Sequence, residues 1–210
     1  MEVGFVRSKF YEDKRLEELF GSWLDTHLYS SLPVEGFSGF QRVNDVRYQK
    51  KGIDTVVQAK DTKLLIDEKA TLHYINKNIP TFAFELLNRT SGAQGWLYNH
   101  SYLTTHYLLA WPNASNPDNI LKADDYSSAD VMLIERTSLI DMLAQKGLDE
   151  TALREKVDYY LPNVNRQNFK FEMVPGITLF FTEWLAEKPV NIVIKKNLLD
   201  TIAIFHKRIY

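Results

Sequence analysis

Asp54, Asp67 and Lys69 stand out in the stretch GIDTVVQAKDTKLLIDEK, which begins at Gly52. Asp54 comes just before an apolar run, and Asp67 follows a second apolar run two residues ahead of Lys69. Carboxylate oxygens are the ligands that Mg²⁺ prefers, and an ammonium group can stabilise charge on an anionic oxygen. These three side chains could therefore hold a divalent cation beside a phosphodiester, provided that the fold brings them together.

The apolar runs around these residues predict a β-hairpin. Its parts are the strand residues 56–57 and 64–66 and the polar turn residues 60–63. Because side chains alternate between the two faces of a strand, Asp67 and Lys69 share one face while Glu68 points to the other. In a hairpin Asp54 then lies near Asp67, at the same end. A change at Glu68 is expected to affect this site far less than a change at either neighbour.

A purely structural interpretation competes with this one, because charged residues at strand ends are often simply solvated. Asp61 and Lys63 in the turn fit that interpretation. The local charge also allows both interpretations. Residues 40–79 include eight basic and five acidic side chains, a net charge of +3, whereas the whole chain carries −2. Such a basic segment suits an anionic substrate, and it equally suits a solvated surface.

The pattern as a whole resembles the PD-(D/E)XK nuclease superfamily, which has the restriction-endonuclease-like fold. The resemblance rests on an apolar triplet followed by Asp-x-Lys and on Gly-Ile-Asp one hairpin upstream, where Ile53 replaces the usual proline. It implies that Asp54 and Asp67 bind Mg²⁺ or Mn²⁺ and that Lys69 helps to activate water. Family members often add an acidic residue from the first helix. Glu17 is the candidate, and a solvated glutamate on the helix flank is its alternative.

The resemblance further implies an endonuclease or exonuclease that hydrolyses DNA phosphodiester bonds. Lys50 and Lys51, just upstream of the motif, are expected to bind the DNA. Gln58, on the same strand face as Asp54, is a further candidate for that contact, although a surface role suits it equally well. A homodimer is left open. The alternative function is that of a non-catalytic nucleic-acid-binding or assembly protein that retains the nuclease fold.

The remaining elements predict one α/β domain over residues 1–210. Apolar residues at helical spacing predict a first helix over residues 8–30, and residues 41–48 predict a strand before the hairpin. This order matches the start of the family's core and implies a central mixed β-sheet flanked by helices, with extra β elements. Further strands are expected at residues 81–87, 107–111, 131–134, 170–174, 177–181 and 191–194, and further helices at residues 137–147 (capped by Thr137 or Ser138), 149–161 and 197–208.

The composition excludes several other classes of site. The chain has no cysteine, which rules out disulfides, thiolate catalysis and cysteine-based metal sites. Its five histidines show no zinc-hydrolase spacing, and its glycines form no phosphate-binding loop motif. The first residues lack the apolar run of a signal peptide, and the chain lacks a membrane-spanning run of about 18 apolar residues. A cytoplasmic protein without a membrane segment is therefore expected.

Overall fold

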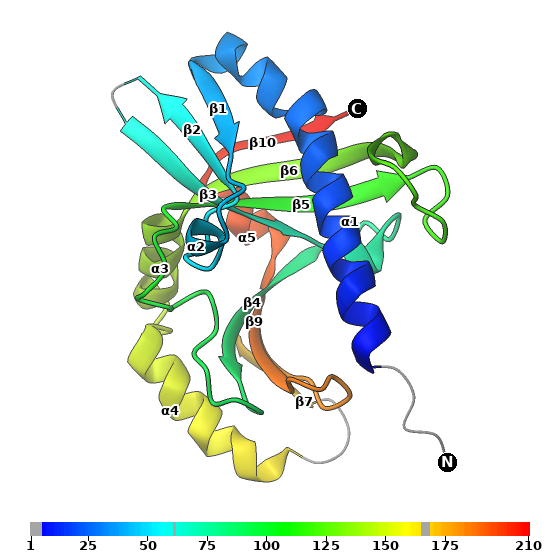
Figure 1. The fold of residues 1–210 in the computed structure, drawn as a ribbon. Coiled ribbons are helices and arrows are strands. Elements are labelled where there is room, and N and C mark those ends of the chain that lie inside the picture. Colours follow the sequence, from blue (N-terminus) through cyan, green and yellow to red (C-terminus); the bar gives the residue numbers. More distant parts are fainter. Residues whose placement is uncertain (1–5, 61, 165–168) are drawn as a thin grey trace. The chain divides into compact units, whose positions relative to one another are not determined.

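The computed structural model describes residues 6–60, 62–164 and 169–210 (Figure 1). Asp61, which was expected to be solvated in the hairpin turn, lies outside the described residues. So do the first five residues, which the signal-peptide expectation concerns. The chain divides into two compact units. Unit 1 contains Met1–Ile79, Thr104–Leu133 and Ile204–Tyr210, and unit 2 contains Pro80–Leu103 and Ile134–Ala203. Each unit is assembled from separate stretches of sequence, and the single domain expected above stays a prediction.

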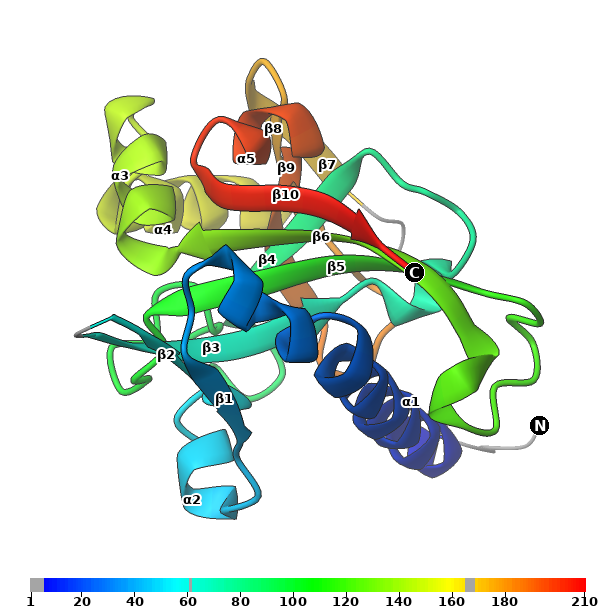
Figure 2. The same cartoon turned by 90° about the horizontal axis from the view of Figure 1, so that it is seen from above.

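Unit 1 is built on a mixed β-sheet (Figures 1 and 2). Its first three strands form an antiparallel meander that contains the expected hairpin, and β3 then pairs with β5 in parallel. The expected mixed α/β class is therefore confirmed. Within the described residues the strands follow the spatial order β1 (Gly39–Arg42), β2 (Thr55–Ala59), β3 (Thr62–Ala70), β5 (His106–Ala114), β6 (Tyr126–Glu135) and β10 (Ala203–Ile209), and short turns lie at η1 (Tyr29–Glu35), η2 (Leu72–Tyr74) and η3 (Ala123–Asp125).

Helix α1 (Val6–His27) packs against one face of this sheet and runs across its strands in both views (Figures 1 and 2). The predicted apolar stripe is confirmed, because Phe20, Trp23 and Leu24 are all buried. They share one core with Ile66 of β3 and with residues of β5 and β6. Burial of this stripe fixes α1 on the sheet, and with it every polar side chain that the helix carries toward β3.

The strand expected over residues 41–48 is wrong beyond Arg42. The chain there forms a short helical turn, α2 (Val46–Gln49). Asp45 precedes this turn, and its carboxylate accepts a hydrogen bond from the backbone N–H of Arg47 at 2.9 Å. An aspartate in this position satisfies an N–H group that a helix start would otherwise leave unpaired, which favours the turn over an extended strand.

The helix expected over residues 197–208 is also wrong. Helix α5 (Lys196–Asp200) ends after little more than one turn, and β10 follows it. Exposure alternates along β10, as in a strand at the edge of a sheet. Leu198, Ile202 and Phe205 recur at helical spacing, but Thr201, Ile202 and Ile204 are β-branched and favour extended backbone where β10 begins.

Unit 2 holds an antiparallel sheet together with helices. The hairpin expected around Pro175 and Gly176 is confirmed, as is the helix whose start is capped by Asp149. The capping role expected for Thr137 or Ser138 is wrong, because that helix begins at Arg136. In spatial order the strands are β4 (Thr81–Asn88), β9 (Pro189–Lys195), β8 (Ile177–Phe181) and β7 (Phe169–Val174), and with α5 the helices are α3 (Arg136–Gln145), α4 (Glu150–Tyr160) and the turn η4 (Leu161–Asn163).

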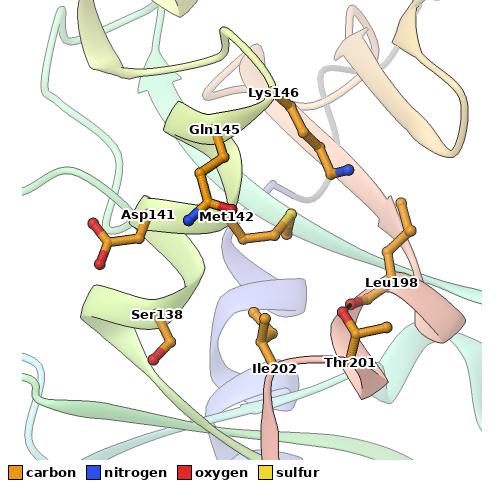
Figure 3. A pocket seen from close by; sticks show the side chains of 8 residues that line it. All are labelled: Ser138, Asp141, Met142, Gln145, Lys146, Leu198, Thr201 and Ile202. Carbon is orange, nitrogen blue, oxygen red and sulfur yellow. Dashed lines mark hydrogen bonds between the residues drawn. The ribbon is translucent and has the colours of Figure 1, made fainter.

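A pocket of about 570 Å³ lies between α3 and α5 in unit 2 (Figure 3). Asp141 and Gln145 of α3 and Thr201, just after α5, are among its lining residues. No residue of the predicted Asp-Lys site lines this pocket. In the described part of the chain, no helix has both the length and the apolar character needed to cross a membrane.

The docking of α1 on the sheet gives a first prediction. We expect Trp23→Ala to lower the free energy of unfolding by about 3–5 kcal/mol, because the indole is 1% exposed and its removal leaves a cavity. Tyr11→Ala on the same helix is the control. That ring is 71% exposed, so its loss should cost less than about 0.5 kcal/mol. Urea denaturation measures both, and equal effects would contradict this packing of α1.

Candidate functional site

The β2–β3 hairpin brings Asp54 and Asp67 to one end of one sheet face. Thr55 lies opposite Ile66 in the antiparallel ladder. The backbone N–H of Asp54 donates to the Ile66 carbonyl at 2.8 Å, so Asp54 extends the ladder by one residue. Side chains alternate along both strands, and Ile66 faces the α1 core. Asp54, Asp67 and Lys69 therefore share the opposite face.

The backbone just before Asp54 is fixed by contacts at Gly52. Gly52 has a φ of 72°, in the left-handed region that glycine adopts at low cost. Its N–H donates to the carbonyl of Gln49 at 2.9 Å, which closes the α2 turn. Its own carbonyl accepts a hydrogen bond at 2.6 Å from the hydroxyl of Thr104, a buried residue. These bonds set the direction in which the chain enters β2.

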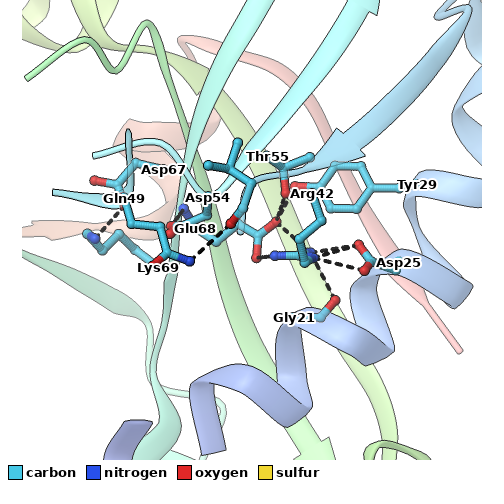
Figure 4. Close-up of polar contacts among 11 residues, drawn as sticks. Gly21, Asp25, Tyr29, Arg42, Gln49, Asp54, Thr55, Asp67, Glu68 and Lys69 are labelled. Atoms are coloured by element: carbon cyan, nitrogen blue, oxygen red, sulfur yellow. Dashed lines mark hydrogen bonds and ion pairs between the residues drawn. The ribbon is translucent and has the colours of Figure 1, made fainter. Parts of the chain in front are cut away.

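Asp54, Asp67 and Lys69 form one cluster of charged groups (Figure 4), which we call the acidic site. The Lys69 ammonium lies 2.5 Å from Asp67 Oδ1. Asp67 is only 2% exposed, and its other oxygen, Oδ2, is buried without a hydrogen-bond partner among the described residues. Asp54 Oδ2 accepts from the backbone N–H of Glu68 at 2.9 Å. The structure thus brings together the three residues that the sequence pattern singled out.

The two carboxyl groups of the acidic site repel each other. Burial, and then the charge of Asp67, raise the pKa of Asp54 to about 6, although Lys69 and the N–H of Glu68 act in the opposite direction. Two carboxylates this close share negative charge that a bound cation can neutralise.

Lys69 stays charged in this setting. Burial alone lowers the pKa of its ammonium, but the charges of Asp67 and Asp54 outweigh burial and raise it above the ordinary value. The Lys69 side chain still keeps 29% of its surface exposed, so part of it borders solvent beside Asp67. Lys69 can therefore act as a permanent positive charge beside a substrate phosphate.

Glu17 of α1 lies within electrostatic range of the acidic site. The residue as a whole is exposed, yet protein atoms around its carboxyl partly desolvate it and raise its pKa, an effect that Lys69 opposes and Asp54 reinforces. Its neighbour Glu18 instead pairs with Lys14 on the helix surface. Of the two glutamates, Glu17 is therefore the one that the structure brings to the site.

The acidic site suits a hard divalent cation that keeps much of its water. No three acidic or histidine side chains in the described ranges are already arranged as metal ligands. Mg²⁺ does not need such a cage, because one or two carboxylates together with substrate phosphate and water commonly hold it. Asp54 and Asp67 can supply these carboxylates. The unpartnered Asp67 Oδ2 offers a lone pair for this purpose.

The three residues expected to bind DNA lie in different settings. Lys50 and Lys51 are exposed at the end of the α2 turn, a few residues before Asp54. Gln58 is at the far end of β2, where its side-chain amide donates to the carbonyls of Lys60 and Thr62 across the hairpin turn. These bonds stabilise the hairpin turn, which lies at the opposite end of β2 from Asp54.

Glu68 takes part in a polar network on the α1 side of β3, which sequence reasoning missed (Figure 4). Its carboxylate accepts hydrogen bonds from Tyr29 at 2.7 Å, from Thr55 at 2.8 Å and from two nitrogens of Arg42 at 3.0 Å each. Arg42 also forms bonds of 2.7–2.9 Å with Asp25. The available signal for this network was Arg42, which lies on the core face of β1. A charged side chain on that face requires a partner of opposite charge.

The raised pKa of Asp54 gives a prediction for Asp54→Asn in metal-free buffer. The folded-state pKa of about 6 exceeds the ordinary value of 3.8, so the stability that Asp54 contributes is complete below about pH 4 and is lost as the pH rises through about 6. Asparagine does not titrate. The stability of the variant relative to wild type should therefore rise between pH 4 and 7, by on the order of 2–3 kcal/mol.

Urea unfolding of both proteins with chelator, at several pH values, measures this difference. A constant offset between the two stability curves would show that Asp54 titrates normally, and that the acidic site does not crowd it.

Comparison of the chain with protein-family models, with curated proteins and with solved structures found no match. What the acidic site does is therefore inferred from its own residues and their geometry.

Proposed function

We propose that this protein is a metal-dependent nuclease of the PD-(D/E)XK type that hydrolyses phosphodiester bonds in DNA. The observation that carries the proposal is the buried, unpartnered Oδ2 of Asp67 beside Asp54 and Lys69. A buried carboxylate oxygen without a donor costs free energy, and a cation held between the two carboxylates offsets that cost. The arrangement therefore favours a cation site over a purely structural ion pair.

Each residue has a distinct role in this proposal. Asp54 and Asp67 would hold Mg²⁺ or Mn²⁺, with Glu17 as a further acidic group from α1. When bound, the ion would stabilise charge on the phosphoryl oxygens and lower the pKa of a coordinated water. Lys69 supplies an ammonium that can turn from Asp67 to a phosphoryl oxygen and stabilise the negative charge that develops there.

The order of the elements also supports the family resemblance. Helix α1 is followed by three antiparallel strands, and the two aspartates come from the second and third of them. This is the order that the resemblance implied. The segment after Lys69 departs from it, because the short turn η2 precedes β4 at the place where the family's core order has a helix.

The alternative is a non-catalytic protein that binds nucleic acid or assembles through the same fold. The ion pair between Lys69 and Asp67 favours it, because a short buried contact of 2.5 Å also suits a site that serves only stability. Nicking of supercoiled plasmid DNA with Mg²⁺ or Mn²⁺, set against the same reaction with chelator, separates the two functions. Cleavage that depends on metal supports the nuclease, and DNA binding without cleavage supports the alternative.

Changes at Asp67 and Lys69 should have different consequences. Asp67→Ala removes a metal ligand, so Mn²⁺ binding should weaken and cleavage should vanish. Lys69→Met keeps the stem and deletes the charge. Mn²⁺ binding should survive or tighten because the competing ammonium is gone, while cleavage should fall by about 10²–10³-fold. Calorimetric titration and plasmid cleavage measure the two effects.

Lys63→Met is the matched control, because Lys63 is exposed at the start of the same strand. It should bind Mn²⁺ and cleave as the wild type does. If Lys69→Met also cleaves at the wild-type rate, Lys69 has no catalytic role.

The α2 turn gives a prediction about DNA binding. We expect Lys50→Gln together with Lys51→Gln to weaken binding to all DNA sequences alike and to reduce its salt dependence, because lysines that contact phosphates release counterions. Lys146→Gln with Lys156→Gln removes the same charge from exposed positions of unit 2 and serves as the control. Fluorescence anisotropy over a range of salt concentrations measures affinity. Equal losses in both pairs would mean that total charge, not the α2 turn, governs binding.

A further inference from the structure

Glu68 of β3 sits in a buried network whose other members come from four further elements of unit 1. Its carboxylate joins α1 and the η1 turn to β1 and β2, through Arg42, Tyr29 and Thr55. Arg42 is fixed in turn by Asp25 and by the backbone carbonyl of Gly21 at 2.9 Å. Glu68 thus accepts hydrogen bonds from three side chains, which restrict it to one position.

The same residue also touches the acidic site through its backbone. The N–H of Glu68 donates to Asp54 Oδ2 at 2.9 Å. The side chain and the amide of Glu68 are joined at one Cα, so hydrogen bonds that hold the carboxylate on one face restrain the backbone from which the amide points. The network on the α1 side therefore determines where the acceptor oxygen of Asp54 lies on the other side.

The position of Asp54 matters because few other groups hold its carboxyl. Burial and the nearby Asp67 both oppose its charged form, and the backbone N–H of Glu68 donates a hydrogen bond to its carboxylate. A small rotation of that amide would let Asp54 turn away from Asp67. The two carboxylates would then no longer be placed to share one cation.

We propose that Glu68, held by Tyr29 and Arg42, is a positioning residue that orients Asp54 for cation binding. This inference rests on the proposed function, because it assigns a task to Glu68 only if the acidic site binds a metal. It reverses the expectation from the strand pattern that a change at Glu68 matters little. Residues that orient metal ligands typically change metal affinity by about 10–100-fold when they are replaced.

The test compares two buried tyrosines of unit 1. Tyr29 is 1% exposed and donates to Glu68, whereas Tyr126 is 3% exposed and donates to the backbone carbonyl of Leu16 at 3.2 Å. Both rings belong to the core beneath α1. Tyr29→Phe and Tyr126→Phe each remove one hydroxyl and one hydrogen bond, so they should lower the melting temperature to a similar extent. If Tyr29 has only a structural role, Tyr29→Phe should lower stability without changing Mn²⁺ affinity.

Mn²⁺ affinity, measured by calorimetry on the folded full chain, is the decisive readout. Tyr29→Phe should weaken Mn²⁺ binding several-fold, and Glu68→Gln by about 10-fold or more, since the neutral glutamine loses the ion pair with Arg42 and one accepting oxygen. Tyr126→Phe should remain within about twofold of the wild type. Raising the Mn²⁺ concentration should restore cleavage by Tyr29→Phe, because its weakness is in binding the ion. If Glu68→Gln does not fold, the pair of tyrosine variants decides.

The failures of the two proposals are distinguishable. If the wild type binds Mn²⁺ and cleaves DNA while Tyr29→Phe and Glu68→Gln bind Mn²⁺ equally well, the positioning role is overturned and the proposed function stands. If the wild type binds no Mn²⁺ at all, the metal site fails, and the positioning role fails with it.

Discussion

Burial of negative charge on both faces of one strand is the constraint that shapes unit 1. Asp67 and Glu68 are consecutive in β3, so they point to opposite faces, and neither is free in solvent. A buried carboxylate is tolerated only when it is paired or hydrogen-bonded. Lys69 pairs with Asp67 on one face, and Arg42 pairs with Glu68 on the other. This requirement constrains α1 and β1, because β1 carries Arg42 and α1 supplies Asp25 and the Gly21 carbonyl that hold it.

The two faces meet this constraint to different degrees. On the α1 side the carboxylate of Glu68 has donors from three side chains, and such satisfied networks are rigid. On the other side Asp67 keeps an unpartnered oxygen and raises the pKa of Asp54. Perturbed acidic groups of this kind are concentrated at functional sites. A rigid network behind an incompletely satisfied pair is the arrangement that a preorganised cation site requires, since the ligands must hold their places before the ion arrives.

The connection after Lys69 passes from the sheet of unit 1 through a strand of the other sheet before it returns. Parallel pairing of β3 with β5 demands a long connection between them. Here that connection contributes β4, which pairs with β9 in the sheet of unit 2. The chain then returns to start β5 at His106. One connection between β3 and β5 thus also supplies a strand to the sheet of unit 2, and the short turn η2 leads directly into that strand.

The sequence by itself determined the features that depend on neighbours along the chain. Helical spacing around Trp23 predicted α1, and strand alternation placed Asp67 and Lys69 on one face with Glu68 on the other. Tertiary structure decided what depends on distant partners. Arg42 reaches Glu68 only because β1, β2 and β3 pair in one register. Residues 203–209 form a strand because they can pair with β6 at the edge of the sheet. Local periodicity records which face is apolar, but a hydrogen bond between segments far apart in sequence leaves no periodic trace.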